Sequence, residues 1–266
     1  MTWTYHLPKD KYYSDDYFTN PEPNVEEMPW YRKRTDPAFK ALGRMGRAVA
    51  KIPGQQRVKM AHQATDFIQH IVYNGEVLSP GEMSAFTSEE YGVCHTFNAK
   101  TANRAVRRAR KPGPAHGVSI VMFIEQEEYL GSVSPAAGVK VVIHNSDARP
   151  FPYEQGIDIA PGQFTSIGLR KTRFIREVPP YGTCTDGKDK PFKGRGLLYK
   201  VNYTTVACER SCLQYYTIDR CGCADVKTPA PAGAILCEEE QDACIEQVTR
   251  EYLVGALACD CPLPCE

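Results

Sequence analysis

The stretch that decides the fold reads Ala207-Cys208-Glu209-Arg210-Ser211-Cys212, and a matching stretch near the end of the chain reads Cys259-Asp260-Cys261-Pro262-Leu263-Pro264-Cys265. Cys208 and Cys212 are four residues apart in a predicted helix, so they share one helix face about 6 Å apart along the axis. Cys259 and Cys261 are two residues apart in a segment that two prolines keep extended, so they share one strand face about 6.6 Å apart. The spacings match, and a strand laid along that helix can form two disulfide rungs.

Cysteine content points to a disulfide scaffold. The chain has 266 residues and 11 cysteines, and ten of these lie between Cys184 and Cys265. Such a density is typical of disulfide-rich domains, and disulfides persist in oxidising compartments. The rival interpretation is a cytosolic zinc protein, because Cys221-Gly222-Cys223 offers two close thiols. Structural zinc sites prefer C-x2-C pairs and no histidine follows His144, so the pattern favours disulfides while zinc stays an alternative.

Charge and hydropathy narrow the class of protein further. The chain carries 32 basic and 32 acidic residues, so net charge gives no support for a nucleic acid or anionic membrane as partner. The longest strongly apolar stretch, residues 118–124, is far shorter than the roughly 20 residues of a spanning helix, and residues 1–30 lack the apolar core of a signal peptide. Asn202-Tyr203-Thr204 is an N-glycosylation sequon. The cysteines and the sequon indicate an extracellular protein, although no segment of this chain would translocate it.

Hydrophobic periodicity predicts a mixed α+β chain. Residues 1–35 are polar and favour an irregular arm. Helices are expected at 36–53 and 55–72, where Phe67, Ile68 and Ile71 form a core stripe. β-Branched and aromatic runs predict antiparallel strands at 94–98, 118–126, 139–144 and 164–174. In the cysteine-rich module, residues 184–266, helices are expected at 204–219 and 238–253.

Five motifs, in this order, resemble the extracellular region of the degenerin/epithelial sodium channel (amiloride-sensitive sodium channel) family. The resemblance covers about residues 55–266, and the run from Arg210 to Gln214 is more similar to the degenerin branch. The motifs are Tyr91-Gly92-Val93-Cys94-His95-Thr96-Phe97-Asn98, Glu127-Glu128-Tyr129-Leu130, Gly138-Val139-Lys140-Val141-Val142-Ile143-His144, Val178-Pro179-Pro180-Tyr181-Gly182-Thr183-Cys184 and the cysteine pattern from Cys208 to Cys265.

The resemblance implies a hand-like α+β ectodomain. After the irregular arm, 1–35, it implies a helical finger at 36–90, an antiparallel β palm and β-ball at 91–183, and a disulfide-rich two-helix thumb at 184–266. Family subunits carry a transmembrane helix on each side of this region, and neither is found here. We therefore expect the chain to be a fragment of a channel subunit.

The resemblance also implies a disulfide pairing. It gives the pairs Cys184–Cys265, Cys208–Cys261, Cys212–Cys259, Cys221–Cys244 and Cys223–Cys237. Cys94 is left unpaired, because its family partner lies in a strand that this chain lacks. A further family bridge, in the finger, aligns with Ile71 and Leu78, so here both of its cysteines are replaced by apolar residues.

The implied function is that of the extracellular portion of a sodium-selective, amiloride-sensitive channel subunit at the plasma membrane. Such a subunit senses a stimulus and couples it to the pore of a homo- or heterotrimer, with no catalytic, cofactor-binding or metal-binding residues and no nucleic acid partner. Tyr181 is expected either to couple the thumb to the pore or to plug the space beneath the thumb. The acidic residues at 238–246 are either a cation-sensing face or a solvated helix N-terminus. Alternatives to a channel are a secreted disulfide-rich binding module and the cytosolic zinc protein.

Overall fold

The computed structural model describes residues 37–101, 104–129, 136–187, 192, 194–199 and 201–266, so the arm expected at 1–35 lies outside the described residues. The longer helices are α1 (Pro37–Ala50), α2 (Gly54–Met60), α5 (Thr205–Cys221) and α6 (Asp242–Leu253), and the shorter ones are α3 (Ala64–Phe67) and α4 (Pro152–Gln155). The strands are β1 (Ile68–Tyr73), β2 (Glu76–Leu78), β3 (Ser84–Ser88), β4 (Gly92–Thr96), β5 (Val118–Met122), β6 (Val139–Val141) and β7 (Ile157–Ile159). The 3₁₀ turns of the described residues are η3 (Pro80–Glu82), η4 (Pro114–His116), η5 (Gln126–Glu128) and η6 (Glu239–Gln241).

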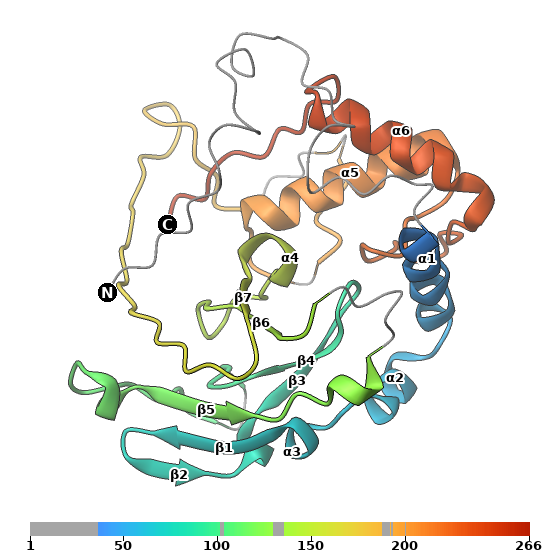
Figure 1. Ribbon diagram of the computed structural model, residues 1–266. Coiled ribbons are helices and arrows are strands. Elements are labelled where there is room, and N and C mark those ends of the chain that lie inside the picture. Colours follow the sequence, from blue (N-terminus) through green and yellow to red (C-terminus); the bar gives the residue numbers. More distant parts are fainter. Residues whose placement is uncertain (1–36, 102–103, 130–135, 188–191, 193, 200) are drawn as a thin grey trace, which may run out of the picture.

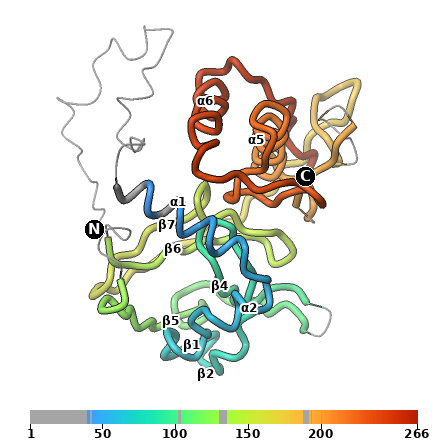
Figure 2. Tube along the Cα trace, turned by 90° about the vertical axis from the view of Figure 1, so that its right-hand side faces the viewer, coloured from blue at the N-terminus to red at the C-terminus, as the bar shows by residue number. Residues whose placement is uncertain are grey.

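These elements are arranged in tiers, with α5 and α6 at one end of the molecule and β1, β2 and β5 at the other (Figures 1 and 2). The strands β6 and β7 lie between the two ends. The three sheets that the described residues form are antiparallel, which confirms the predicted α+β class. Among the residues that the structure describes, none of the helices combines the length and apolar character needed to cross a bilayer.

The helix predicted over 55–72 is wrong, because the chain there forms two short helices and a strand. After α2, Ala61 is extended, and Gln63 begins α3 with a capping box closed by Asp66. Residues from Ile68 onward then pair with β2 on one side and β5 on the other. Apolar residues three and four apart fit a helix, but a β-branched run can bury the same side chains in a sheet once strands flank it. Pairing with the neighbouring strands therefore outweighs the helical spacing of the apolar residues.

The hairpin of β1 and β2 turns at Asn74-Gly75. Asn74 has φ 54° and Gly75 has φ 80°, the left-handed pair that a two-residue type I′ turn requires. Ile71 lies directly opposite Leu78, and both side chains are buried. With Ala64 and Ile68 they form the core of this end of the molecule. Two packed apolar residues therefore occupy the positions that align with the two cysteines of the family's finger disulfide.

Two of the other predicted strands, at 118–126 and 139–144, are shorter than expected, the one at 94–98 lies two residues earlier at the same length, and one is absent. β4 and β5 begin near their predicted starts, while β6 stops at Val141 and pairs with β7, which the sequence analysis does not predict. Residues 164–174 form no strand, and this prediction is wrong. The segment is an extended trace outside any sheet (Figure 1), and its exposed apolar residues include Phe164, Leu169 and Phe174. β-Branched composition favours a strand, but a strand also needs a neighbour, and none pairs with this segment within the described residues.

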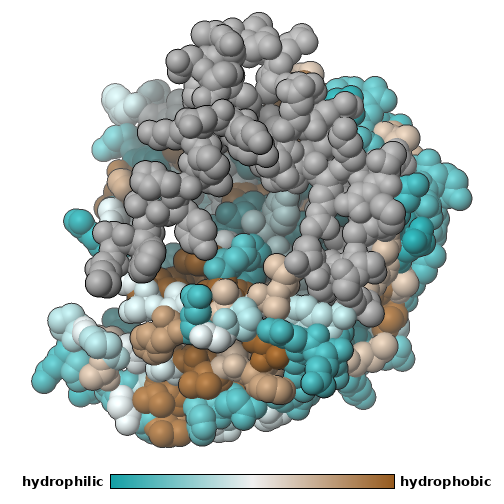
Figure 3. Space-filling model, viewed as in Figure 1, coloured by the Kyte–Doolittle hydropathy of each residue, from teal (hydrophilic) through white to brown (hydrophobic). Residues whose placement is uncertain are grey.

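In Figure 3, hydrophobic residues cluster in the lower part of the visible face, over the sheet of strand order β2-β1-β5. Exposed apolar residues on the outer face of this sheet include Val77 and Val121, which pair with Val72 and His70 of β1. The opposite side chains of β1 face the core around Ile71. The sheet is therefore buried on one side only, as is common for antiparallel sheets.

The cysteine-rich module contains the two predicted helices, which pack against each other. α5 begins after Thr204, whose side chain accepts a hydrogen bond from the Ala207 amide, and ends at Gly222, which has φ 73°. A threonine N-cap and a left-handed glycine are the usual helix boundaries. α6 begins at Asp242 rather than 238, because η6 precedes it.

Candidate functional site

Two disulfides fasten the extended tail to one face of α5. Cys208 is bonded to Cys261 and Cys212 to Cys259, with Cα–Cα distances of 5.7 Å and 6.0 Å. Both helix cysteines are buried. The i, i+4 spacing on the helix and the i, i+2 spacing on the tail therefore form the two rungs that the sequence geometry predicts.

Three more disulfides close the cysteine-rich module. Cys184 is bonded to Cys265 and so joins the two ends of the module. Cys221–Cys244 ties the last residue of α5 to α6, and Cys223–Cys237 closes the loop between them. These five pairs coincide with those that the family resemblance implies. All ten sulfurs of the module are joined in these five disulfides, so none of them is a thiolate that could bind zinc.

Gln214 organises the loop that follows α5, a role that the sequence analysis misses. Its buried amide donates to the carbonyls of Asp225 and Thr228 at 2.9 Å and 3.2 Å and accepts from the Asp225 amide at 3.0 Å. A polar residue at a helical core position is the only sequence signal for this contact. The amide satisfies backbone groups that would otherwise be buried without partners.

Arg210, one turn before Gln214, connects the cysteine-rich module to the rest of the molecule. Its guanidinium bonds the carboxylates of Glu90, in the β3–β4 turn, at 2.8 Å and Glu154, in α4, at 2.5 Å. Only 15% of the Arg210 side chain is exposed, so this pair is protected from bulk water. Burial raises the pKa of the Glu90 carboxyl, and Arg210 acts against this shift.

A second arginine holds the same β3–β4 turn. Arg149 donates to the Thr87 carbonyl and to the Glu89 carboxylate, both at 2.9 Å, and lies over the Tyr199 ring at 5.2 Å. Tyr199 packs edge-on against Phe151 in a small core shared with α5. Arg210 and this aromatic core therefore connect α5 to the region of the β3–β4 hairpin, and Arg149 connects the same core to the β3–β4 turn.

The acidic start of α6 is solvent-exposed, as the alternative of a solvated helix N-terminus predicts, with the side chains of Glu238 and Glu239 52% and 51% exposed, and basic residues of α1 and its end pair with it. Arg47 bonds Asp242 at 2.9 Å and Lys51 bonds Glu238 at 2.8 Å, while Arg44 lies 3.8 Å from Glu239. The basic residues at 44, 47 and 51 share one helix face, which the sequence analysis does not single out. The Lys51 hydrogen bond lowers the pKa of the Glu238 carboxyl. We call this set the α1–α6 ionic contact.

Tyr181 is exposed over 88% of its surface, which contradicts the plug alternative. Its loop is a tight turn in which the amides of Tyr181 and Gly182 both donate to the Val178 carbonyl. A side chain at Gly182 would collide with the Glu177 carbonyl oxygen at 2.0 Å, so only glycine fits. The loop therefore presents Tyr181 outward from a constrained backbone, and its coupling role stays a prediction.

The remaining predicted residues lie apart from this site. Asn202 is exposed, so the sequon is accessible, and its glycosylation stays a prediction. Cys94 lies on β4 opposite Phe86 and has no disulfide partner in the described part of the chain. Burial raises the pKa of its thiol to about 11, so the thiol is protonated at neutral pH.

Comparison with known proteins shows the family. The profile of the amiloride-sensitive sodium channel matches residues 8–266. The chain is 32% identical over 225 residues to the epithelial sodium channel subunit alpha of Anolis carolinensis, covering 82% of this chain and 34% of the relative. It is 31% identical over 224 residues to subunit alpha of Neoceratodus forsteri (82% and 34%) and 29% identical over 216 residues to subunit gamma of Oryctolagus cuniculus (79% and 32%). The chain therefore belongs to the amiloride-sensitive sodium channel family.

The chain spans about a third of the length of these relatives. All three relatives are epithelial sodium channel subunits, and members of this family are ion channel subunits rather than enzymes. Assignment to the degenerin branch stays a prediction.

Proposed function

We propose that this chain is the extracellular portion of a sodium-selective, amiloride-sensitive channel subunit at the plasma membrane, where it receives the gating stimulus and couples it to the pore. The observation that carries the proposal is the family match over residues 8–266, together with five disulfides that require an oxidising compartment. The exposed sequon at Asn202 supports the same location.

Within this portion we assign a finger to residues 36–90, a palm and β-ball to 91–183 and a thumb to 184–266. The contacts of the thumb support a coupling role. The disulfides tie α5, α6 and the tail together, and Arg210 links α5 to the β3–β4 turn at a part-buried site. The α1–α6 ionic contact links the thumb to the finger. A force or ligand acting on the thumb is therefore transmitted to both neighbours.

Tyr181, which lies just before the thumb, is the proposed link between the thumb and the pore-bearing part of the subunit. An aromatic ring that is almost fully exposed on a constrained turn is well suited to pack against a partner surface. The apolar side chains exposed along residues 164–178 need covering for the same reason. We propose that both surfaces contact parts of a complete subunit and that subunits assemble as a homo- or heterotrimer.

The alternative is a secreted disulfide-rich binding module, and the complete transcript separates the two functions. A channel subunit predicts an apolar stretch of about 20 residues encoded on each side of the present sequence. A secretory leader before residue 1, with a stop codon directly after Glu266, would instead establish the secreted module. Peptide mapping under non-reducing conditions tests separately whether the protein is extracellular. Both functions predict the five disulfides, whereas a cytosolic protein would have free thiols.

A further inference from the structure

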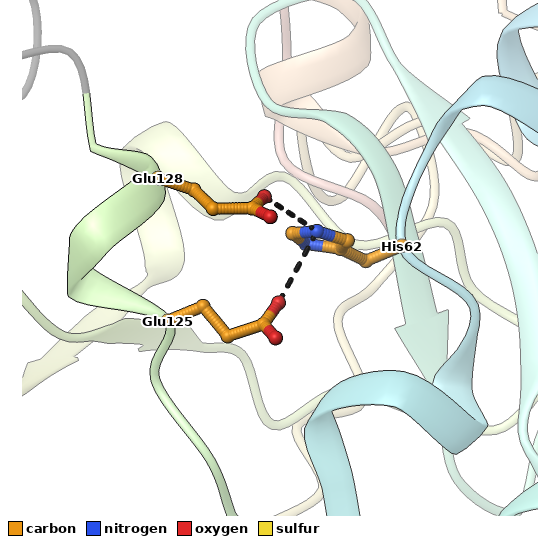
Figure 4. A group of neighbouring side chains, drawn as sticks. All are labelled: His62, Glu125 and Glu128. Carbon is orange, nitrogen blue, oxygen red and sulfur yellow. Dashed lines mark hydrogen bonds and ion pairs between the residues drawn. The ribbon is translucent and has the colours of Figure 1, made fainter.

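The loop between α2 and α3 brings His62 against two carboxylates at the end of β5. His62 Nε2 lies 3.3 Å from Glu125 Oε2 and 3.0 Å from Glu128 Oε2, and Figure 4 shows both carboxylates pointing at the same imidazole edge. One imidazole nitrogen carries at most one proton, so it can satisfy only one of these oxygens well. Two negative groups converging on one nitrogen are stabilised by a cation placed between them.

The spacing of the three ligand atoms fits a transition metal ion. A tetrahedral Zn²⁺ ion with ligands at about 2.0–2.1 Å holds neighbouring ligand atoms about 3.3–3.4 Å apart. The two nitrogen–oxygen distances are 3.3 Å and 3.0 Å, and all three ligand atoms lie within 4.8 Å of one another. Small rotations of the glutamate side chains therefore complete three ligands around one ion.

Both ligand-bearing segments are held in place by the backbone. Gln63 Nε2 donates to the carbonyls of Val58 and Ala61, which fixes the loop that presents His62. Glu125 and Glu128 are three residues apart at η5, where the Glu128 amide donates to the Glu125 carbonyl at 3.1 Å. A 3₁₀ turn has three residues per turn, so both carboxylates project from one side. The Phe123 amide also donates to the Phe67 carbonyl at 2.7 Å, which joins the two segments.

We propose that His62, Glu125 and Glu128 form a binding site for a divalent transition metal ion of the zinc class. One imidazole and two carboxylates suit Zn²⁺ or Co²⁺, whereas Ca²⁺ and Mg²⁺ prefer oxygen ligands alone. His62 is 52% exposed and Glu128 64%, so water completes the coordination and the ion enters from solvent. Binding joins the α2–α3 loop to the end of β5 and stabilises this end of the molecule.

The test is calorimetric titration of the full oxidised chain with ZnCl₂, together with Co²⁺ absorption spectroscopy. We expect one saturable Zn²⁺ site and a visible Co²⁺ spectrum without the sulfur-to-cobalt band that binding at Cys94 would give. His62→Ala and the isosteric double variant Glu125→Gln/Glu128→Gln should each weaken Zn²⁺ binding at least about tenfold. His70→Ala, which removes an exposed histidine of β1, is the matched control and should bind as the unmodified chain does.

Three results would overturn the site: unchanged Zn²⁺ affinity in His62→Ala, unchanged affinity in the double glutamine variant, or no saturable binding by the unmodified chain in the millimolar range. Equal affinity for Ca²⁺ and Zn²⁺ would also contradict the proposal, because it would show that the imidazole is not a ligand. Far-UV circular dichroism of each variant verifies that the fold is retained. The double glutamine variant keeps the test decisive even if His62→Ala unfolds the loop.

Discussion

At the scale of single residues, Gln214 shows how a polar side chain can specify a fold from inside it. Its amide makes three hydrogen bonds to the loop at 225–228 and is almost fully buried. Gln214→Leu keeps the volume but leaves backbone groups of that loop unpaired, so the free energy of unfolding should fall by about 2 kcal/mol. Urea denaturation with the disulfides intact measures this, and Gln247→Ala on the exposed side of α6 should stay within about 0.5 kcal/mol. An equally small effect at Gln214 would show that water replaces the amide.

Cys94 gives a prediction about pH. Because burial raises the pKa of its thiol to about 11 from the ordinary 9.0, iodoacetamide should label one thiol per chain slowly at neutral pH. The labelling rate should keep rising up to about pH 11. The folded state favours the neutral thiol, so its contribution to stability is complete below pH 9 and is lost between pH 9 and 11. A labelling rate that levels off near pH 9 would contradict the burial of Cys94. A Cys94-linked dimer would show instead that the thiol is accessible to a second chain.

At the scale of elements, the α1–α6 ionic contact joins segments nearly 200 residues apart in sequence. Its central pair, Arg47 with Asp242, is only 11% and 22% exposed, so it should contribute more than an ordinary surface ion pair. Arg47→Glu should destabilise the chain, and Arg47→Glu/Asp242→Arg should recover about 1 kcal/mol of the loss. Arg44→Glu, at the exposed and longer pair, is the control and should have little effect.

The pH dependence of this contact follows from Glu238. Its pKa is lowered by Lys51, so the contribution of this pair is present at neutral pH and is lost as the pH falls through that lowered value. Mild acid should therefore leave the contact intact.

For the central pair, additive effects of Arg47→Glu and Asp242→Arg in the double variant would show that Arg47 and Asp242 do not interact.

The β1–β2 hairpin allows a test of its register. Ile71 and Leu78 are direct antiparallel partners, and such Cα atoms are about 4.5–5.5 Å apart, within disulfide range. Ile71→Cys/Leu78→Cys should therefore oxidise spontaneously and form one new bridge, detectable by non-reducing peptide mapping. Ile71→Cys/Glu76→Cys, offset by two residues, should stay reduced. Efficient bridging of the offset pair alone would mean that the register is different.

At the scale of the whole molecule, the cysteine-rich module was the most predictable part and the described residues before it were the least predictable. The spacings of the cysteines in the helix and in the tail, around Cys208 and Cys259, predict the two rungs. A disulfide allows only a narrow Cα–Cα distance, and the rise per residue of a helix and of a strand shows whether both pairs can meet it. The helix wrongly predicted at 55–72 and the strand at 164–174 fail for a common reason. Whether an apolar run forms a strand depends on its neighbours in space, and neither Phe164 nor Ile71 carries that information locally.

The contacts between parts were the least predictable feature of the site. Arg210, Glu90 and Glu154 lie far apart in the sequence, and no spacing relates them. The same holds for His62 and the two glutamates of the proposed metal site. Motif order identified the family, but the residues that join one part of the molecule to another became visible only in three dimensions.

The most direct test of the account is the amiloride-sensitive sodium current of a complete subunit that contains this chain, expressed alone and with its companion subunits in oocytes. We predict a sodium current that amiloride blocks and that Tyr181→Ala changes in its gating while the amount of protein at the cell surface stays the same. Normal gating with Tyr181→Ala would remove this residue from the coupling path. A complete subunit that reaches the surface in every combination and carries no amiloride-sensitive sodium current would contradict the central claim.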